Sequence, residues 1–180
     1  MRSCLEHESE IVAMAKVKAG QTSLLQRREI EAQIAAPLVK AFMDEFGRER
    51  TLKTVERVIK MLAKRKGAEM AKVAGGNSLK HFAKTVLPVW CEGRALKIEV
   101  LEANDQRCSF NVTRCKYAEM YQQLGLEKFG LLFSCSRDFA FIGGFNPRLK
   151  LKRTHTIMEG DRVCDFRIVR GKQRGRRCGE

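Results

Sequence analysis

The sequence has no apolar run of the roughly 18 residues that a membrane-spanning helix needs, and aromatic residues make up only 7% of it. The longest apolar stretch, around 129–145, is interrupted by two serines, an arginine and an aspartate. The N-terminus is acidic, whereas a secretory signal starts with basic residues and an apolar segment. We therefore expect a cytoplasmic protein without membrane contact. Its 180 residues, 44% of them hydrophobic, are enough for one core, so a single domain over 1–180 is expected.

The sequence also lacks any Cys-x-x-Cys pair, although it contains seven cysteines. An odd number of widely spaced cysteines does not indicate a disulfide framework. The missing pair also removes the usual signature of structural zinc or a redox dithiol. We expect free thiols, no metal and no cofactor. The cysteines are Cys4, Cys91, Cys108, Cys115, Cys135, Cys164 and Cys178.

The net charge of +14 is unevenly distributed, with +7 in residues 51–100 and +5 in 151–180. Proteins that bind nucleic acids usually interleave such cations with aromatic side chains that stack on bases. Those aromatic residues are missing, so the sequence favours a solvated helix face and a loose tail over a nucleic-acid partner. We expect 1–20 and 171–180 to be flexible, and deletion of 171–180 to leave folding and activity intact.

The first half of the sequence is typical of helices. Apolar residues recur about every 3.6 positions from 23 to 46 and again from 52 to 73, and both patterns stop at glycines. Asn77 or Ser78 is expected to cap a third helix that ends near residue 86, just ahead of Pro88.

After Gly93 the apolar period changes from 3.6 to 2, which is typical of strands. The pattern predicts an α+β fold in which the N-terminal helices pack on one face of a four-stranded antiparallel sheet. Two hairpins provide the strands, and two helices lie between the hairpins. The predicted strands are 96–103, 107–113, 149–157 and 163–169, and the predicted helices are 114–124 and 127–142.

Both of these later helices combine a cysteine with a carboxylate. Cys115 and Glu119 are four positions apart and would share one face of the helix at 114–124. Cys135 and Asp138 lie on an apolar stripe of the helix predicted at 127–142. An ionised carboxylate in such a place needs a partner, a raised pKa or both. Two interpretations stay open. A carboxyl group beside a thiol suits proton transfer and nucleophilic attack, whereas Cys135 can also be a small core residue and Asp138 the edge of a solvated face.

The strand predicted at 149–157 places polar residues on an apolar face. If its side chains alternate regularly, Arg153 and His155 lie on the side of Leu151, and Thr154 and Thr156 lie on the other side. A lone histidine in such a place is more often structural than a ligand. A guanidinium on an apolar face requires a fixed anion, which is either an internal carboxylate or a substrate.

Several segments resemble one protein family in their order and spacing. They read T-R-C-x-Y-A-E, S-C-x-R-D-F, G-F-N-P, and R-T-x-T followed by G-x-x-x-C-D-F, all within residues 105–168. These motifs are similar to those of the L-2-amino-thiazoline-4-carboxylic acid hydrolase family. The resemblance implies hydrolysis of a cyclic amidine-like carbon–sulfur bond, which converts the thiazoline to a carbamoyl-cysteine on the way to cysteine. The last segment is also similar to vinyl-reductase-type ligand-binding domains, in agreement with an α+β fold.

The chemistry that the resemblance implies assigns roles to the polar residues. Ring opening needs a nucleophile at the amidine carbon, a proton for the departing sulfur and a cation for the substrate carboxylate. Either Cys135 attacks directly while a carboxylate moves protons, or the carboxylate activates a water and the thiols only line the pocket. A third version, with thiols and His155 as metal ligands, matches no common spacing. The candidate catalytic residues are Cys135, Asp138 and Glu119, and the candidate substrate-binding residues are Arg114, Arg153, Thr154, Thr156 and Cys115.

Two other classes of protein compete with this enzyme. A non-catalytic small-ligand or sensor domain would keep the pocket but would not need Cys135 or Asp138. A nucleic-acid-binding protein would use the basic helix and tail, and its binding would depend steeply on salt. The presence of Cys135, Asp138 and Arg153 in one chain favours the enzyme. A homo-oligomer is compatible with the sequence, which does not decide the oligomeric state.

Overall fold

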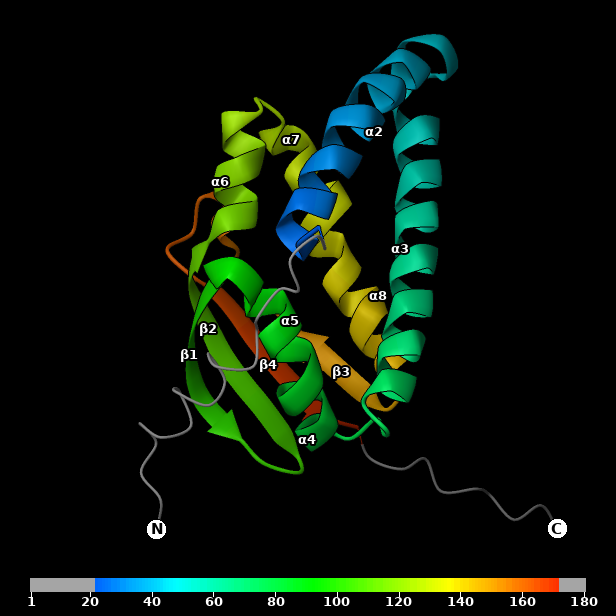
Figure 1. Ribbon diagram of the computed structural model, residues 1–180. Helices are drawn as coiled ribbons and strands as arrows, with labels where there is room; N and C mark the ends of the chain where they lie inside the picture. The colour runs from blue at the N-terminus through cyan, green and yellow to red at the C-terminus, as the bar shows by residue number, and fades with distance from the viewer. Residues whose placement is uncertain (1–21, 172–180) are drawn as a thin grey trace, which may run out of the picture.

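The computed structural model describes residues 22–171, so the predictions for 1–20 and for the tail beyond Gly171 lie outside the described residues. Two long helices come first, followed by a broken helix, a hairpin, two further helical segments and a second pair of strands (Figure 1). The helices are α2 (Leu24–Phe46), α3 (Arg48–Val73), α4 (Leu79–His81), η1 (Phe82–Val86), α5 (Leu87–Cys91), η2 (Glu92–Arg94), α6 (Lys116–Gln123), α7 (Glu127–Gly130), η3 (Leu131–Cys135), α8 (Ser136–Phe145) and η4 (Ile157–Glu159). The strands are β1 (Leu96–Ala103), β2 (Arg107–Cys115), β3 (Leu149–Lys152) and β4 (Cys164–Arg170).

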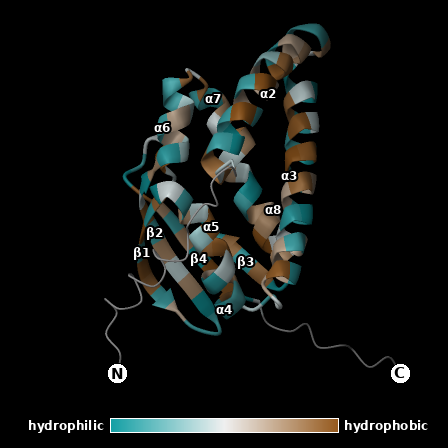
Figure 2. Cartoon of the chain, in the orientation of Figure 1, coloured by the Kyte–Doolittle hydropathy of each residue, from teal (hydrophilic) through white to brown (hydrophobic). Residues whose placement is uncertain are grey.

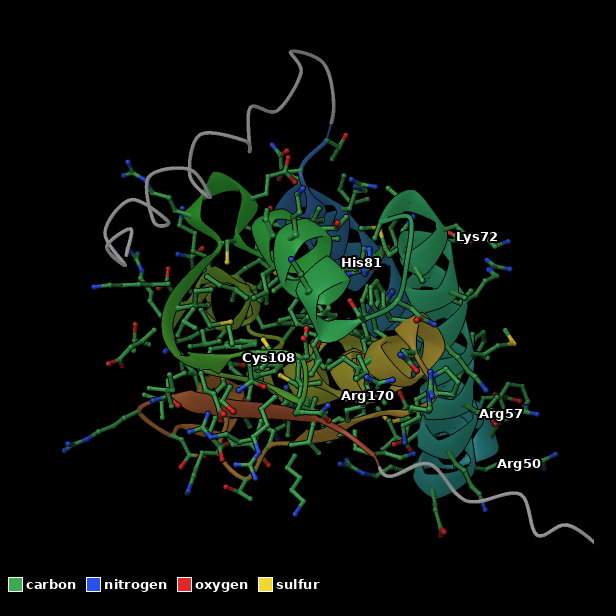
Figure 3. All side chains as sticks on the ribbon, turned by 90° about the horizontal axis from the view of Figure 1, so that it is seen from below. Arg50, Arg57, Lys72, His81, Cys108 and Arg170 are labelled. Atoms are coloured by element: carbon green, nitrogen blue, oxygen red, sulfur yellow. The ribbon has the colours of Figure 1, made fainter. Side chains whose placement is uncertain are left out.

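The four strands form one antiparallel sheet in the order β1-β2-β4-β3. Phe110 on β2 lies opposite Phe166 on β4, and their rings stack with centroids 4.8 Å apart. The helices cover one side of this sheet (Figures 1 and 3). The predicted α+β architecture is therefore confirmed.

Local sequence signals explain where α2 begins and ends. The Ser23 hydroxyl accepts a hydrogen bond from the Gln26 amide, and the Gln26 side chain accepts one from the Ser23 amide, which forms a capping box. Gly47, with φ of 83°, separates α2 from α3 in a backbone conformation that residues with a Cβ rarely adopt. The second helix consequently starts at Arg48, four residues earlier than its apolar pattern predicts.

Three predicted boundaries are wrong. Strand β2 continues to Cys115, so α6 begins at Lys116 and does not contain Cys115. The broken third helix does not end before Pro88 but runs on to Cys91, because the proline occupies the first turn of α5, where no amide donor is needed. Strand β3 stops at Lys152, since the amides of Thr154 and His155 donate to the Asp165 carboxylate instead of continuing a ladder.

Helix α8, which carries Asp138 and begins directly after Cys135, packs unusually close to α3. A Cβ added to Gly67 on α3 would lie 2.1 Å from the Phe141 carbonyl oxygen, and one added to Gly144 on α8 would lie 2.0 Å from the Lys64 carbonyl oxygen. Only glycine fits at these two positions. The close contact anchors α8 against the longest helix of the described chain.

The outer surfaces of α2 and α3 differ in character. Figure 2 shows hydrophobic residues recurring along α2, and Figure 3 shows Arg50, Arg57 and Lys72 pointing outward from α3. Among residues 22–171, no helix is both long enough and apolar enough to span a membrane. The large apolar side chains that α2 exposes lie four residues apart: Ile30, Ile34, Leu38, Phe42 and Phe46.

Candidate functional site

A cavity of about 370 Å³ lies among the N-terminal part of α2, the C-terminal half of α3, α5, α8 and the sheet. In Figure 1 the start of α2 lies between α6 and α3, and α2 contacts both of these helices. The inner wall is apolar and aromatic, with Trp90, Phe141 and Phe166 among its residues. A second hollow, at the α2–α3 turn, is lined by Gly47 and four charged residues, with no aromatic or thiol side chain among them. The first cavity has the size and mixed lining of a small-molecule site.

Asp138 and Arg153 form an ion pair on the wall of this cavity. Arg153 Nη1 donates to Asp138 Oδ2 at 2.5 Å, and Nη2 donates to the Cys135 carbonyl at 3.1 Å. The guanidinium carbon also lies 5.1 Å from the ring centroid of Phe166 and 5.2 Å from that of Phe139. The Arg153 side chain is only 7% exposed. These contacts hold the guanidinium in one orientation.

Burial raises the pKa of Asp138 to about 6, although Arg153 acts in the opposite direction. For Arg153, burial is the largest single influence and lowers the pKa, but the charge and hydrogen bond of Asp138 together with the nearby cysteines outweigh it and hold the pKa above its usual value. The sequence predicts a partner, a raised pKa or both for this carboxylate, and the structure gives it both. A carboxyl group with a pKa near 6 can exchange protons at neutral pH.

Two of the thiols that line the cavity, those of Cys135 and Cys115, are not activated. Burial raises the pKa of Cys135 to about 12, and the charge of Asp138 adds to the effect. Burial raises the pKa of Cys115 to about 11. The Cys135 sulfur lies 3.7 Å from Thr156 Oγ1, which also accepts hydrogen bonds from the Met158 amide and the Cys164 thiol. A nucleophilic cysteine needs a lowered pKa or an adjacent base, and these contacts provide neither.

Five of the sequence-predicted residues gather at the cavity. Cys135, Asp138, Arg153 and Cys115 line it, and Thr156 is buried behind Cys135. Cys115 reaches the cavity from the end of β2 and not from a helix.

Three predicted site residues lie elsewhere. Arg114 and Glu119 form an exposed ion pair, with Nε 2.7 Å from Oε1, and neither lines the cavity. Thr154 is exposed and donates its hydroxyl hydrogen to Asp165. His155, predicted to share the apolar face, is 60% exposed in its side chain and lies near Asp161. The regular alternation behind the predictions for Thr154 and His155 fails because β3 ends at Lys152.

Sequence reasoning missed several residues that line the cavity. Arg137, Tyr117 and Trp90 received no role. Arg137 and Tyr117 belong to the motifs S-C-x-R-D-F and T-R-C-x-Y-A-E, so the motifs themselves contained that signal. The α2 residues that line the cavity, including Arg28, gave no such signal, because their position depends on packing between distant segments.

Within residues 22–171, no three His, Cys, Asp or Glu side chains lie close enough to hold a metal ion. The thiol and histidine ligand set considered from the sequence therefore has no counterpart in the described part of the chain. Cys115 and Cys135 line the cavity, whereas His155 points toward solvent.

Comparison with known proteins places this geometry in context. The sequence pattern of the L-2-amino-thiazoline-4-carboxylic acid hydrolase family matches residues 27–168, which includes the helices as well as the motif-bearing segments. No curated protein gives a significant match to the sequence.

Two solved structures share the fold at low sequence identity. The phenol-responsive sensory domain of the transcription activator PoxR, solved with phenol, is 11% identical, with a TM-score of 0.54, and the alignment covers 94% of this chain and 92% of that one. Subunit 3 of the trafficking protein particle complex from Naegleria fowleri, covalently bound to palmitic acid, is 12% identical, with a TM-score of 0.51 and coverage of 81% and 96%. At such identities the likeness concerns the fold alone.

Proposed function

Because the chain belongs to the L-2-amino-thiazoline-4-carboxylic acid hydrolase family, we propose that it is a hydrolase that opens a small cyclic amidine-type ring bearing a carboxylate. The proposed substrate is L-2-amino-thiazoline-4-carboxylate or a close analogue, and the product is the corresponding carbamoyl-cysteine. The observation that carries the proposal is the Asp138–Arg153 pair, in which a carboxyl group with a pKa of about 6 lines a small-molecule cavity.

In the proposed reaction Asp138 acts as a general base. Its ionised carboxylate takes a proton from water, and the resulting hydroxide attacks the ring carbon between sulfur and nitrogen. The ring nitrogen takes the remaining hydroxyl proton of the tetrahedral intermediate, the carbon–oxygen double bond forms, and the carbon–sulfur bond breaks. The departing sulfur receives the proton from Asp138, which regenerates the carboxylate. One water is consumed, and its oxygen becomes the carbonyl oxygen of the carbamoyl group.

Arg153 positions the base in this mechanism. Two of its nitrogens are engaged by Asp138 and by the Cys135 carbonyl, and two aromatic rings flank its guanidinium. Its positive charge keeps the pKa of Asp138 from rising further, so that the base is ionised at neutral pH. The sequence-based role of Arg153 as the main grip on the substrate carboxylate is less favoured, because an internal carboxylate already occupies it.

Between the two versions left open by the sequence, the thiol environment favours water as the nucleophile. With a pKa of about 12, only about one Cys135 thiol in 100,000 is ionised at pH 7. Cys135 and Cys115 then serve as apolar lining near the reacting ring. Thr156 contributes by fixing the Cys135 and Cys164 thiols instead of touching the ring.

A non-catalytic ligand-binding or sensor domain is the second candidate function. The aromatic inner wall, with Trp90, Phe141 and Phe166, suits a flat apolar ring, and the PoxR domain with the same fold was solved with phenol. Such a domain would bind the ring and release it unchanged. The ionisable pair in the cavity favours the hydrolase, since simple binding of an apolar ring gains nothing from a buried carboxylate.

Incubation of the purified protein with L-2-amino-thiazoline-4-carboxylate separates the two functions. The fluorescence of Trp90, the single tryptophan of the chain, reports binding because the residue lines the cavity. Mass spectrometry reports the carbamoyl-cysteine. If the protein is a hydrolase, it should bind the thiazoline and form the carbamoyl-cysteine, with or without a chelator. Binding without product supports the sensor domain, and the absence of binding removes the proposed substrate.

A further inference from the structure

The cavity is rich in positive charge. Five arginines and one lysine line it, against two glutamates and one aspartate: Arg27, Arg28, Arg65, Lys66, Arg137, Arg153, Glu31, Glu69 and Asp138. A wall with this excess of cations attracts anions and holds them more strongly than open water does. The ion pairs among these residues show which cations have no partner within the chain and are therefore available to bind an anionic ligand.

Most of the cations already have partners within the chain. Arg28 pairs with Glu31, and Arg153 pairs with Asp138. Lys66 and Arg65 share Glu69, at 3.2 and 3.9 Å. These carboxylates partly or fully neutralise the cations beside them. In the described part of the chain, two cavity cations are left without an ion pair, Arg27 and Arg137.

Arg27 and Arg137 differ in their surroundings. Arg27 is exposed, and water can solvate its charge, whereas Arg137 is half-buried at the start of α8. Burial lowers the pKa of Arg137, and the charge of Arg28 lowers it further, only partly opposed by Glu31. A guanidinium that has lost part of its hydration and faces another arginine is in an unfavourable position without an anion. An incoming carboxylate would relieve both effects.

We propose that Arg137 is the subsite that binds the carboxylate of a small ring ligand in this cavity. Arg137 and Asp138 are consecutive residues on α8, so a bound carboxylate and the reacting ring carbon would lie at the same end of this helix. The aromatic wall formed by Trp90, Phe141 and Phe166 would contact the ring. The subsite rests on the proposed function only for the identity of the ring, because a sensor domain for ring carboxylates would use it equally.

The subsite assigns to Arg137 the role that the sequence assigned to Arg114 and Arg153. Arg114 lies outside the cavity in an exposed pair with Glu119, and Arg153 is engaged by Asp138. A planar guanidinium is suited to bidentate binding of a carboxylate, which an ammonium group cannot reproduce.

Titration of Trp90 fluorescence tests the subsite with ligands that do or do not carry the charge. The probes are L-2-amino-thiazoline-4-carboxylate, benzoate and the neutral analogue benzamide. For Arg137→Gln we expect the Kd of each bound carboxylate to rise by about 10- to 100-fold, as for loss of a charge-assisted hydrogen bond, and the Kd of benzamide to stay within about twofold. Arg137→Lys, which retains the charge, should show an intermediate loss.

Arg65→Gln is the matched control, because Arg65 also lines the cavity but is 71% exposed and shares Glu69 with Lys66. It should change the Kd of every probe by no more than about threefold. If wild type binds benzoate but not the thiazoline, and Arg137→Gln abolishes that binding, the subsite stands and the proposed substrate is wrong. The subsite is refuted if neither carboxylate binds wild type, if Arg137→Gln leaves carboxylate binding unchanged, or if it weakens benzamide binding equally.

Discussion

The pH dependence of turnover should report the ionisation of Asp138. With a pKa of about 6, about nine tenths of Asp138 is ionised at pH 7 and about one tenth at pH 5. Since only the ionised carboxylate can take a proton from water, kcat/KM should fall about tenfold between pH 7 and pH 5. The ion pair with Arg153 lowers this pKa, so Arg153→Gln should move the midpoint of the acid limb to higher pH.

Initial rates of thiazoline consumption from pH 4.5 to pH 8, measured for wild type, Asp138→Asn and Arg153→Gln, would check this assignment. Asp138→Asn should lower the rate on the order of 100-fold and remove the enzyme's contribution to the acid limb. Ionisation of the substrate affects all three proteins alike, so differences between the profiles belong to the enzyme. An acid limb with the same midpoint in wild type and Arg153→Gln would refute the reasoning, as would wild-type rates in Asp138→Asn.

Three further outcomes are expected. Cys135→Ala should keep turnover within a few-fold of wild type, because a thiol with a pKa of about 12 is not a nucleophile; loss of most turnover in both Cys135→Ala and Cys135→Ser would restore the thiol as the attacking group. Gly67→Ala should destabilise the fold by about 1–3 kcal/mol in urea unfolding, since its Cβ would meet a backbone oxygen of α8, whereas Gly143→Ala, with open space around it, should be neutral or stabilising by up to about 1 kcal/mol. The exposed apolar side chains of α2 favour a homo-oligomer, so sedimentation should show self-association that Ile34→Lys weakens, and a monomer at all concentrations would contradict this expectation.

The fold was largely predictable from the sequence because its signals are local. The change of apolar period after Gly93 separates the N-terminal helices from the sheet, and the turn residue Asn104 caps the first hairpin by accepting hydrogen bonds from the amides of Gln106 and Arg107. The end of β3 was not predictable in this way. It depends on the distant residue Asp165, whose carboxylate accepts hydrogen bonds from the amides of Thr154 and His155. These amides would otherwise pair within the sheet.

The candidate site was predictable where polar residues interrupt an apolar pattern within one element. Cys135 and Asp138 share an apolar stripe, and a polar pair on such a stripe indicates a partner, which proved to be Arg153. Whether a surface charge faces the cavity depends on tertiary packing. Arg114 and Glu119 therefore satisfy each other on the outside, while Arg137 turns toward the cavity.

A time course of carbamoyl-cysteine formation from L-2-amino-thiazoline-4-carboxylate at pH 7 tests the central claim most directly. Wild type and Asp138→Asn are compared with Glu119→Gln, a carboxylate variant outside the cavity. Steady product formation is predicted for wild type and Glu119→Gln, and a rate on the order of 100-fold lower for Asp138→Asn. Wild type that binds the thiazoline without forming product, or Asp138→Asn that matches wild type, would contradict hydrolysis by a water that Asp138 activates.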